Sequence, residues 1–193
     1  MKDDNIRICG VVAEFDPFHN GHSYFLEQAR ARSGCDYLVV CMTGSFTQRG
    51  EAACLDKMTR VRHALACGAD AVFELSTLWA VRPADAFALG GISVLSGIGC
   101  DALSFGCETE DVQLLRQLAA LRDDEPAEVS KLIRSKLERG VSHAAARGEA
   151  LSQYLGISNA ELNRPNMILA TEYIRCLSHL EHRMEIIPIR RRG

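Results

Sequence analysis

The chain has 193 residues, enough for one domain with a complete hydrophobic core. Hydrophobic residues make up 47% and charged residues 24%, and the net charge of −3 argues against nucleic-acid binding through bulk electrostatics, which leaves only local basic patches. Residues 1–5 are polar and no apolar run approaches the ~20 residues of a membrane span, so we expect a cytoplasmic protein without a signal peptide or membrane contact.

The first part of the chain has the pattern of a strand, a tight turn and a helix. An apolar run over residues 6–13 predicts a buried strand, which must end before Asp16-Pro17 because a central strand cannot accommodate proline. After Gly21 the apolar residues follow a helical spacing, and Asn20 is placed to cap the first turn of that helix.

Two histidines, His19 and His22, fall at the beginning of this predicted helix. The unpaired N–H groups of a helix N-terminus and the positive end of its dipole favour phosphate. Each imidazole can donate a hydrogen bond to a phosphate oxygen, and their charge can offset the negative charge that builds when pyrophosphate leaves. An isolated H-x-G-H is equally compatible with an ordinary surface turn, so the flanking residues decide.

Residues 15–22, with the sequence Phe-Asp-Pro-Phe-His-Asn-Gly-His, resemble the HxGH signature of the nucleotidyltransferase superfamily, in the form typical of the tRNA(Met) cytidine acetate ligase family. Asp16 departs from that form, in which asparagine is more frequent, and adds a carboxylate near the phosphates. The resemblance implies catalytic roles for His19 and His22 at the triphosphate. It also implies a nucleotide site formed by Val12, Ala13, Glu14, Phe15, Asp16, Pro17, Phe18, His19, Asn20, Gly21, His22, Ser23, Tyr24 and Phe25.

A second apolar run, over residues 37–42, follows a helix stop at Gly34 and predicts a strand parallel to the first. The next segment, 43–51, has no apolar periodicity and predicts a loop at the carboxyl end of that strand. Ligands bind at this edge of open parallel sheets, so we expect Gln48 and Arg49 to lie near the HxGH turn.

The helix predicted over residues 55–68 carries Lys57 and Arg60. Both residues are compatible with a solvated helix face, which we favour from the pattern alone, or with a position facing phosphates. The loop and helix together resemble a second conserved block of the same family. That resemblance implies that Gln48, Arg49 and Lys57 shape the active site, with Lys57 as a catalytic residue.

The middle of the chain predicts a third strand over 69–75, a helix of small residues over 84–95 and a fourth strand over 101–105. Gly106, which follows, permits close approach of the backbone to a ligand, or simply a strand-to-helix turn. Residues 105–108 resemble a Phe-Gly-x-Glu step of the family, which implies that Gly106 lies against the nucleotide.

The segment near residues 110–160 predicts a helical insertion with little catalytic character. Its basic side chains predict a solvated helix face, with RNA contact as the alternative. These side chains are Lys131, Arg134, Lys136 and Arg139.

The last part of the chain predicts a helix that begins after Pro165 and a fifth strand over residues 184–189. Asn166 can cap this helix or face a ligand. Its surroundings resemble the family's Pro-Asn-x-x-Leu block, and Arg191 with Gly193 resembles an Arg-x-Gly step. The resemblance implies that Asn166 and Arg191 contact the nucleotide.

The eight cysteines are scattered, with no C-x-x-C pair, so we expect reduced structural thiols and neither a zinc site nor a disulfide framework. They are Cys9, Cys35, Cys41, Cys54, Cys67, Cys100, Cys107 and Cys176.

Together these patterns predict an α/β protein with a Rossmann-like HxGH nucleotidyltransferase fold, in which a parallel sheet of about five strands is flanked by helices. We expect one nucleotidyltransferase-like domain over residues 1–193. The loops after the first, second and fourth strands and the end of the last strand should converge on one ATP site.

The resemblance further implies a reaction of ATP with acetate to give acetyl-adenylate and pyrophosphate, followed by acetyl transfer to N4 of the wobble cytidine of elongator tRNA(Met). Mg²⁺ would serve as a phosphate counter-ion, although no dedicated carboxylate cage for it is evident. The helical C-terminal region with which the family helps to hold tRNA is absent from these residues. Two alternatives stay open: another adenylyl or cytidylyl transferase, and a truncated paralogue that binds nucleotide without turnover.

Overall fold

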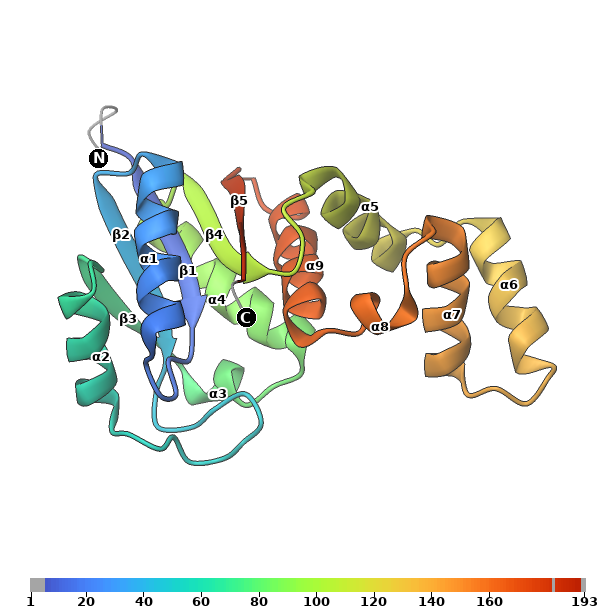
Figure 1. Ribbon diagram of the computed structural model, residues 1–193, viewed down its shortest axis with the longest axis horizontal. Coiled ribbons are helices and arrows are strands. Elements are labelled where there is room, and N and C mark those ends of the chain that lie inside the picture. Colours follow the sequence, from blue (N-terminus) through green and yellow to red (C-terminus); the bar gives the residue numbers. More distant parts are fainter. Residues whose placement is uncertain (1–5, 182, 192–193) are drawn as a thin grey trace.

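In the computed structural model, which describes residues 6–181 and 183–191, five strands form one parallel sheet in the order β3-β2-β1-β4-β5 (Figure 1). Each of the five predicted apolar segments forms one of these strands. The strands are β1 (Ile8–Ala13), β2 (Tyr37–Thr43), β3 (Ala71–Leu75), β4 (Ala102–Cys107) and β5 (Glu185–Arg190). The predicted sheet is therefore confirmed.

The strand order reverses beside β1. The chain moves from β1 outward to β2 and β3, and then returns to the other side of β1 with β4 and β5. The register pairs Val11 with Val40 on one side and with Ser104 on the other. In open parallel sheets, ligands bind outside the carboxyl ends of the strands at such a reversal, which here lies between β1 and β4.

Successive side chains of a strand point to opposite faces of the sheet, and in the central strands they are mostly apolar on both faces. Helices therefore cover both faces of the sheet. On one face α1 (Asn20–Ser33) and α2 (Lys57–Ala66) pack over a core that includes Val11, Leu26 and Val40. On the other face a larger core includes Ile92, Leu103 and Ile174. The helices of that second layer are α3 (Thr77–Ala80), α4 (Ala84–Ile98), α5 (Val112–Asp123) and α9 (Pro165–Ser178).

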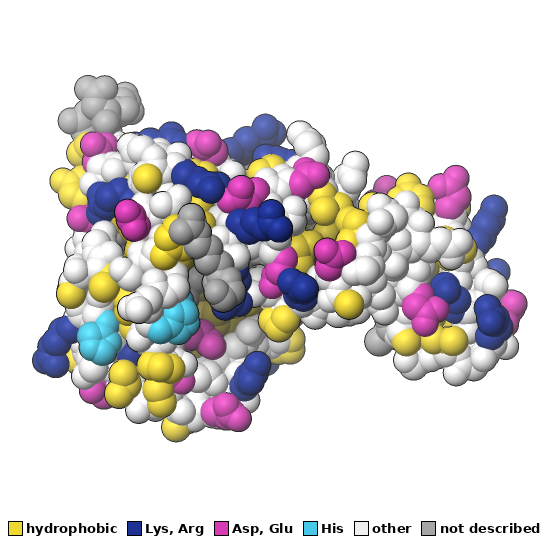
Figure 2. Space-filling view, viewed as in Figure 1, with side chains coloured by type: hydrophobic (Ala, Val, Ile, Leu, Met, Phe, Trp, Pro, Cys, Tyr) yellow, Lys and Arg dark blue, Asp and Glu magenta, His cyan; other side chains and the backbone are white. Residues whose placement is uncertain are grey.

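Between α5 and α9 the chain forms α6 (Ala127–Leu137), α7 (His143–Leu155) and the short α8 (Asn159–Leu162). The α6–α7 pair projects away from the sheet as a separate lobe (Figures 1 and 2). The lobe packs around a third, smaller core, in which Val129, Ile133, Ala146 and Ala150 are buried together with Leu121 of α5. It is therefore structurally distinct from the strand ends that form the site described below.

None of the helices in the described part of the chain combines the length and the apolar character that crossing a bilayer requires.

Candidate functional site

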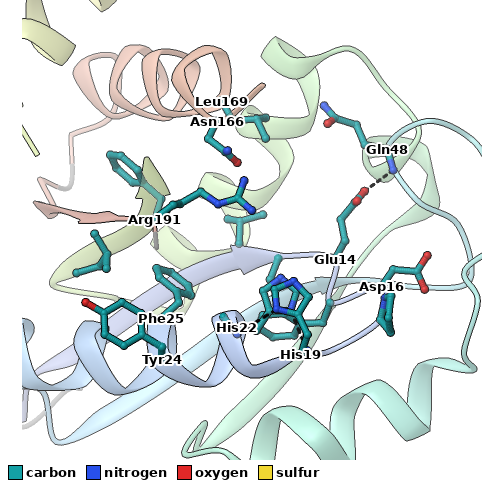
Figure 3. Close-up of a pocket in the computed structure, with 18 of the residues that line it drawn as sticks. Glu14, Asp16, His19, His22, Tyr24, Phe25, Gln48, Asn166, Leu169 and Arg191 are labelled. Carbon is teal, nitrogen blue, oxygen red and sulfur yellow. Dashed lines mark hydrogen bonds between the residues drawn. The ribbon is translucent and has the colours of Figure 1, made fainter. Parts of the chain in front are cut away.

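A cavity of about 640 Å³ opens at the carboxyl edge of the sheet, beside the reversal between β1 and β4 (Figure 3). Its walls come from the β1–α1 turn, the loop after β2, the end of β4, the start of α9 and the end of β5. Fifteen of the predicted site residues line it: Val12, Ala13, Glu14, Phe15, Asp16, Pro17, His19, Asn20, Gly21, His22, Tyr24, Phe25, Gly106, Asn166 and Arg191. Segments far apart in the sequence thus meet at one place, as expected for strand ends that share an edge.

The first turn of α1 is capped by His19 rather than by Asn20, which is the first residue of the helix. The Nδ1 atom of His19 accepts a hydrogen bond of 3.1 Å from the N–H of Gly21. The Nδ1 atom of His22 accepts one of 3.4 Å from the N–H of His19. Our expectation for Asn20 was wrong by one residue, because a reciprocal histidine pair replaces the usual short polar cap.

This capping pattern determines which ring nitrogen of each histidine carries the proton. A nitrogen that accepts a hydrogen bond must be unprotonated, so in the neutral rings the proton sits on Nε2. The rings of His19 and His22 are stacked, with 3.7 Å between centroids and 21° between planes. Neither Nε2–H has a hydrogen-bond partner among the described residues, and both donors are therefore available to a ligand.

His22 is neutral at physiological pH. Burial lowers its pKa to about 4, with further lowering from the neighbouring His19 and from the positive charge of Arg191. Arg191 extends into the cavity from the side opposite the histidines (Figure 3). A bound anion would reverse part of this effect, because its negative charge favours the imidazolium.

Two aromatic side chains, Phe15 and Phe18, pack against the ring of His22. Phe15 is 2% exposed, and its ring meets that of His22 edge-on with 4.9 Å between centroids. The centroid of the Phe18 ring lies 5.5 Å from that of His22 and 4.9 Å from that of Phe15. Phe15 lines the cavity and Phe18 does not. Phe18 therefore contributes by supporting the imidazole ring of His22. Ser23 is also absent from the lining, and its N–H bonds to the carbonyl oxygen of His19.

Two carboxylates of the β1–α1 turn tie this turn to the segment that follows β2. A carboxylate oxygen of Glu14 accepts from the N–H of Gln48, and Asp16 accepts from the N–H of Cys54 at 2.8 Å. Gln48 lines the cavity as we expected, whereas Arg49 does not. Because both carboxylates already accept main-chain hydrogen bonds, they help to order the loop.

Arg60 supports the same two loops from inside the protein. It is fully buried and donates to the carbonyl oxygens of Glu14 at 2.6 Å, of Gly44, and of Leu55 at 3.2 Å. The solvated and the phosphate-facing positions that we considered for Arg60 are both wrong. The overlooked signal is its helical spacing, since Arg60 and Ala64 are the two buried residues of α2 and lie four residues apart.

Asn166 lines the cavity from the start of α9 but does not cap that helix. Its amide nitrogen instead donates to a carboxylate oxygen of Glu108 at 3.0 Å. Of the two roles that we considered for Asn166, the structure excludes capping and leaves the side chain at the cavity wall.

Comparison with known proteins places this geometry in a family. Residues 6–193 match the model of a family described as HIGH Nucleotidyl Transferase. The chain belongs to the HIGH nucleotidyl transferase family. The five-stranded parallel sheet with helices on both faces is the Rossmann-like fold predicted for an HxGH nucleotidyltransferase.

Relatives of this HIGH nucleotidyl transferase carry the name tRNA(Met) cytidine acetate ligase. The protein from Bacillus subtilis is 40% identical over 88% of this chain and 41% of its own length. The one from Clostridium kluyveri is 35% identical over 97% of this chain and 48% of its own length. A crystal structure of Thermotoga maritima TmcAL bound with alpha-thio ATP superposes with a TM-score of 0.87 at 36% identity, covering 97% of this chain and 47% of that one. The chain thus spans about half the length of the curated relatives it matches.

Lys57 and the residues after Arg191 are the remaining parts of the predicted site in this HIGH nucleotidyl transferase. Lys57 does not line the cavity, and its ammonium group pairs with Glu74 at 2.7 Å. Its catalytic role stays a prediction. Arg192 and Gly193, which would complete the Arg-x-Gly step with Arg191, lie outside the described residues.

Nowhere in residues 6–181 and 183–191 do three histidine, cysteine, aspartate or glutamate side chains gather where they could hold a metal ion together.

Proposed function

We propose that the cavity binds ATP and that the chain activates acetate as acetyl-adenylate, for transfer of the acetyl group to N4 of the wobble cytidine of elongator tRNA(Met). The observation that carries this proposal is the pair of Nε2–H donors at the N-terminus of α1, facing Arg191 across a cavity of about 640 Å³. The names of the relatives and the nucleotide in Thermotoga maritima TmcAL support the choice of ATP and acetate.

In the proposed reaction an oxygen of acetate attacks the α-phosphorus of ATP, and the bond to the bridging oxygen between the α- and β-phosphates breaks. The chain supplies orientation and charge neutralisation, and no protein nucleophile is needed. His19 and His22 would donate from Nε2 to the phosphate oxygens on which charge accumulates. The unpaired N–H groups of the first turn of α1 would act on the same oxygens.

The other predicted contacts surround the nucleotide in this proposal. Gly106, Asn166 and Arg191 would hold it from the far side of the cavity. Arg49 and Lys57 would be additional phosphate contacts, and Lys57 would have to leave Glu74 to reach one. Mg²⁺ would enter with the triphosphate as its counter-ion. The tRNA partner implies a cytoplasmic protein.

Exchange of labelled pyrophosphate into ATP tests the adenylation step. We expect exchange that depends on acetate, and we expect His19→Ala and His22→Ala each to lower its rate at least tenfold, in line with the loss of a preorganised donor. His143→Ala, at the exposed start of α7, is the matched control and should leave the rate unchanged. Absence of acetate-dependent exchange in a protein that binds ATP would contradict the proposal.

The two alternative functions predict other outcomes of the same assay. A different adenylyl or cytidylyl transferase would show exchange with another co-substrate in a panel of nucleotides and acceptors. A paralogue without turnover would bind ATP and show no exchange with any co-substrate.

A further inference from the structure

The hydrogen bond between Glu108 and Asn166 constrains what the cavity offers to a nucleotide. Glu108 lies just after β4 and Asn166 at the start of α9, 58 positions apart, and their side chains meet at 3.0 Å. A carboxylate has only acceptors, so the amide of Asn166 must present its nitrogen to Glu108. The oxygen of the same amide then lies on the cavity side (Figure 3).

The environment of Glu108 indicates more than a structural role. Its second carboxylate oxygen is buried and has no hydrogen-bond partner among the described residues. Leaving a buried acceptor unpaired is costly, and structures keep such groups mainly where function requires them. A glutamine would fill the same volume without the carboxylate, but it would also offer an N–H to Asn166 and so permit the opposite orientation of the amide.

We propose that Glu108 is a positioning residue that fixes the amide of Asn166 with its oxygen toward the nucleotide, so that the site selects nucleosides with a hydrogen-bond donor at that point. The donor is either the 6-amino group of adenine or a ribose hydroxyl. The inference rests on the proposed nucleotide site but not on the acetate reaction. It makes Asn166 an acceptor for the ligand and Glu108 the residue that enforces this role.

Equilibrium binding of a nucleotide series to the purified chain tests the inference. The series contains ATP, ITP, which has a 6-keto group in place of the 6-amino group, and the 2′-deoxy and 3′-deoxy forms of ATP. We expect the wild-type chain to discriminate at least tenfold against ITP or against one deoxy form, because a site built around a hydrogen bond rejects the analogue that lacks it. The analogue that is rejected identifies the donor.

Glu108→Gln separates positioning from structure. We expect its melting temperature to be no lower than that of the wild type, while the discrimination falls to less than threefold because the amide of Asn166 can turn over. In the Asn166→Ala background, Glu108→Gln should change the discrimination no further, as for two residues that act as one unit. Glu161→Gln is the matched control and should keep the wild-type ratio, because Glu161 lies on α8 and its carboxylate accepts a hydrogen bond from the hydroxyl of Ser158.

Undiminished discrimination in a folded Glu108→Gln variant would overturn the inference, and so would a wild-type chain that binds all four nucleotides equally. Binding with the expected selectivity but without pyrophosphate exchange would support the inference and contradict only the acetate reaction. Absence of binding to every nucleotide would overturn both.

Discussion

Gly21 lies directly against the imidazole ring of His19, so that a β-carbon at position 21 would come within 2.9 Å of Cε1 and 3.0 Å of Nδ1. Gly21→Ala should therefore push the ring out of its capping position and out of its stack with His22. Loss of the cap costs about 0.5–2 kcal/mol. We expect a modest fall in melting temperature, but a decrease in ATP affinity of at least tenfold, measured by calorimetric titration.

Gly97→Ala provides the control for this substitution. Gly97 lies in α4, and apart from its chain neighbours and the nearby backbone of the helix no described atom would come within 4 Å of an added β-carbon. An alanine there should stabilise the helix by about 0.5–1 kcal/mol and leave ATP affinity unchanged. An equal loss of affinity in both variants would contradict the assignment of the effect to His19.

Arg60 provides the second prediction, because it is a buried cation that donates its hydrogen bonds to uncharged oxygens. Arg60→Met would leave the carbonyl oxygens of Glu14 and Gly44 without this donor, which we expect to lower the free energy of unfolding by about 2–4 kcal/mol. Arg60→Lys should recover part of that loss. Urea unfolding followed by circular dichroism measures both.

Arg62→Met tests whether the position matters rather than the residue type. Arg62 is exposed on the same helix, so its replacement should change stability by less than about 0.5 kcal/mol. If both methionine variants unfolded at the same urea concentration as the wild type, the role of Arg60 as a link between the two loops would be refuted.

The sheet and the location of the site were predictable, because both follow from local patterns and one topological rule. Apolar runs separated by helical spacing predict parallel strands, and parallel strands bring their carboxyl ends to one edge. This reasoning predicts the edge of the sheet at which the cavity lies, whereas the assignment of Gly106 and Arg191 to the same cavity as His19 came from the family resemblance.

The polar contacts that shape the cavity were not predictable in the same way. Arginine is typical of a solvated helix face, and only the packing of α2 against the sheet buries Arg60. The partner of Asn166, Glu108, is 58 positions away, and no local pattern signals a pair at that distance. Histidine is not among the preferred capping residues, so propensity alone favoured Asn20 over His19.

The lowered pKa of His22 predicts a pH dependence of stability with a defined sign. The pKa is about 4 in the folded chain and about 6.5 in the unfolded chain, so the unfolded state binds more protons between these values. Stability should therefore fall as the pH is lowered from 6.5 toward 4, and His22→Gln should weaken this dependence. Urea unfolding at a series of pH values measures the effect.

Ring NMR resonances of His22 test the same assignment directly. We expect a midpoint near pH 4 in the free chain and a higher midpoint when ATP is bound, because the triphosphate favours the charged ring. Arg191→Gln should also raise the midpoint of the free chain, since the positive charge of Arg191 is one cause of the shift. A midpoint near 6.5 in the free wild-type chain would contradict the burial of this ring.

The α6–α7 lobe should be dispensable for nucleotide binding, because its core is separate from the strand ends. Val129 is fully buried in that core, and Val129→Asp would place an unpaired carboxylate there at a cost of several kcal/mol. We expect hydrogen exchange to accelerate throughout residues 127–155 while ATP affinity stays within twofold of the wild type. Leu137→Asp, at a site that is 40% exposed, should accelerate exchange only at the end of α6. Loss of protection in β1 and β4 as well would show that the lobe and the sheet unfold as one unit.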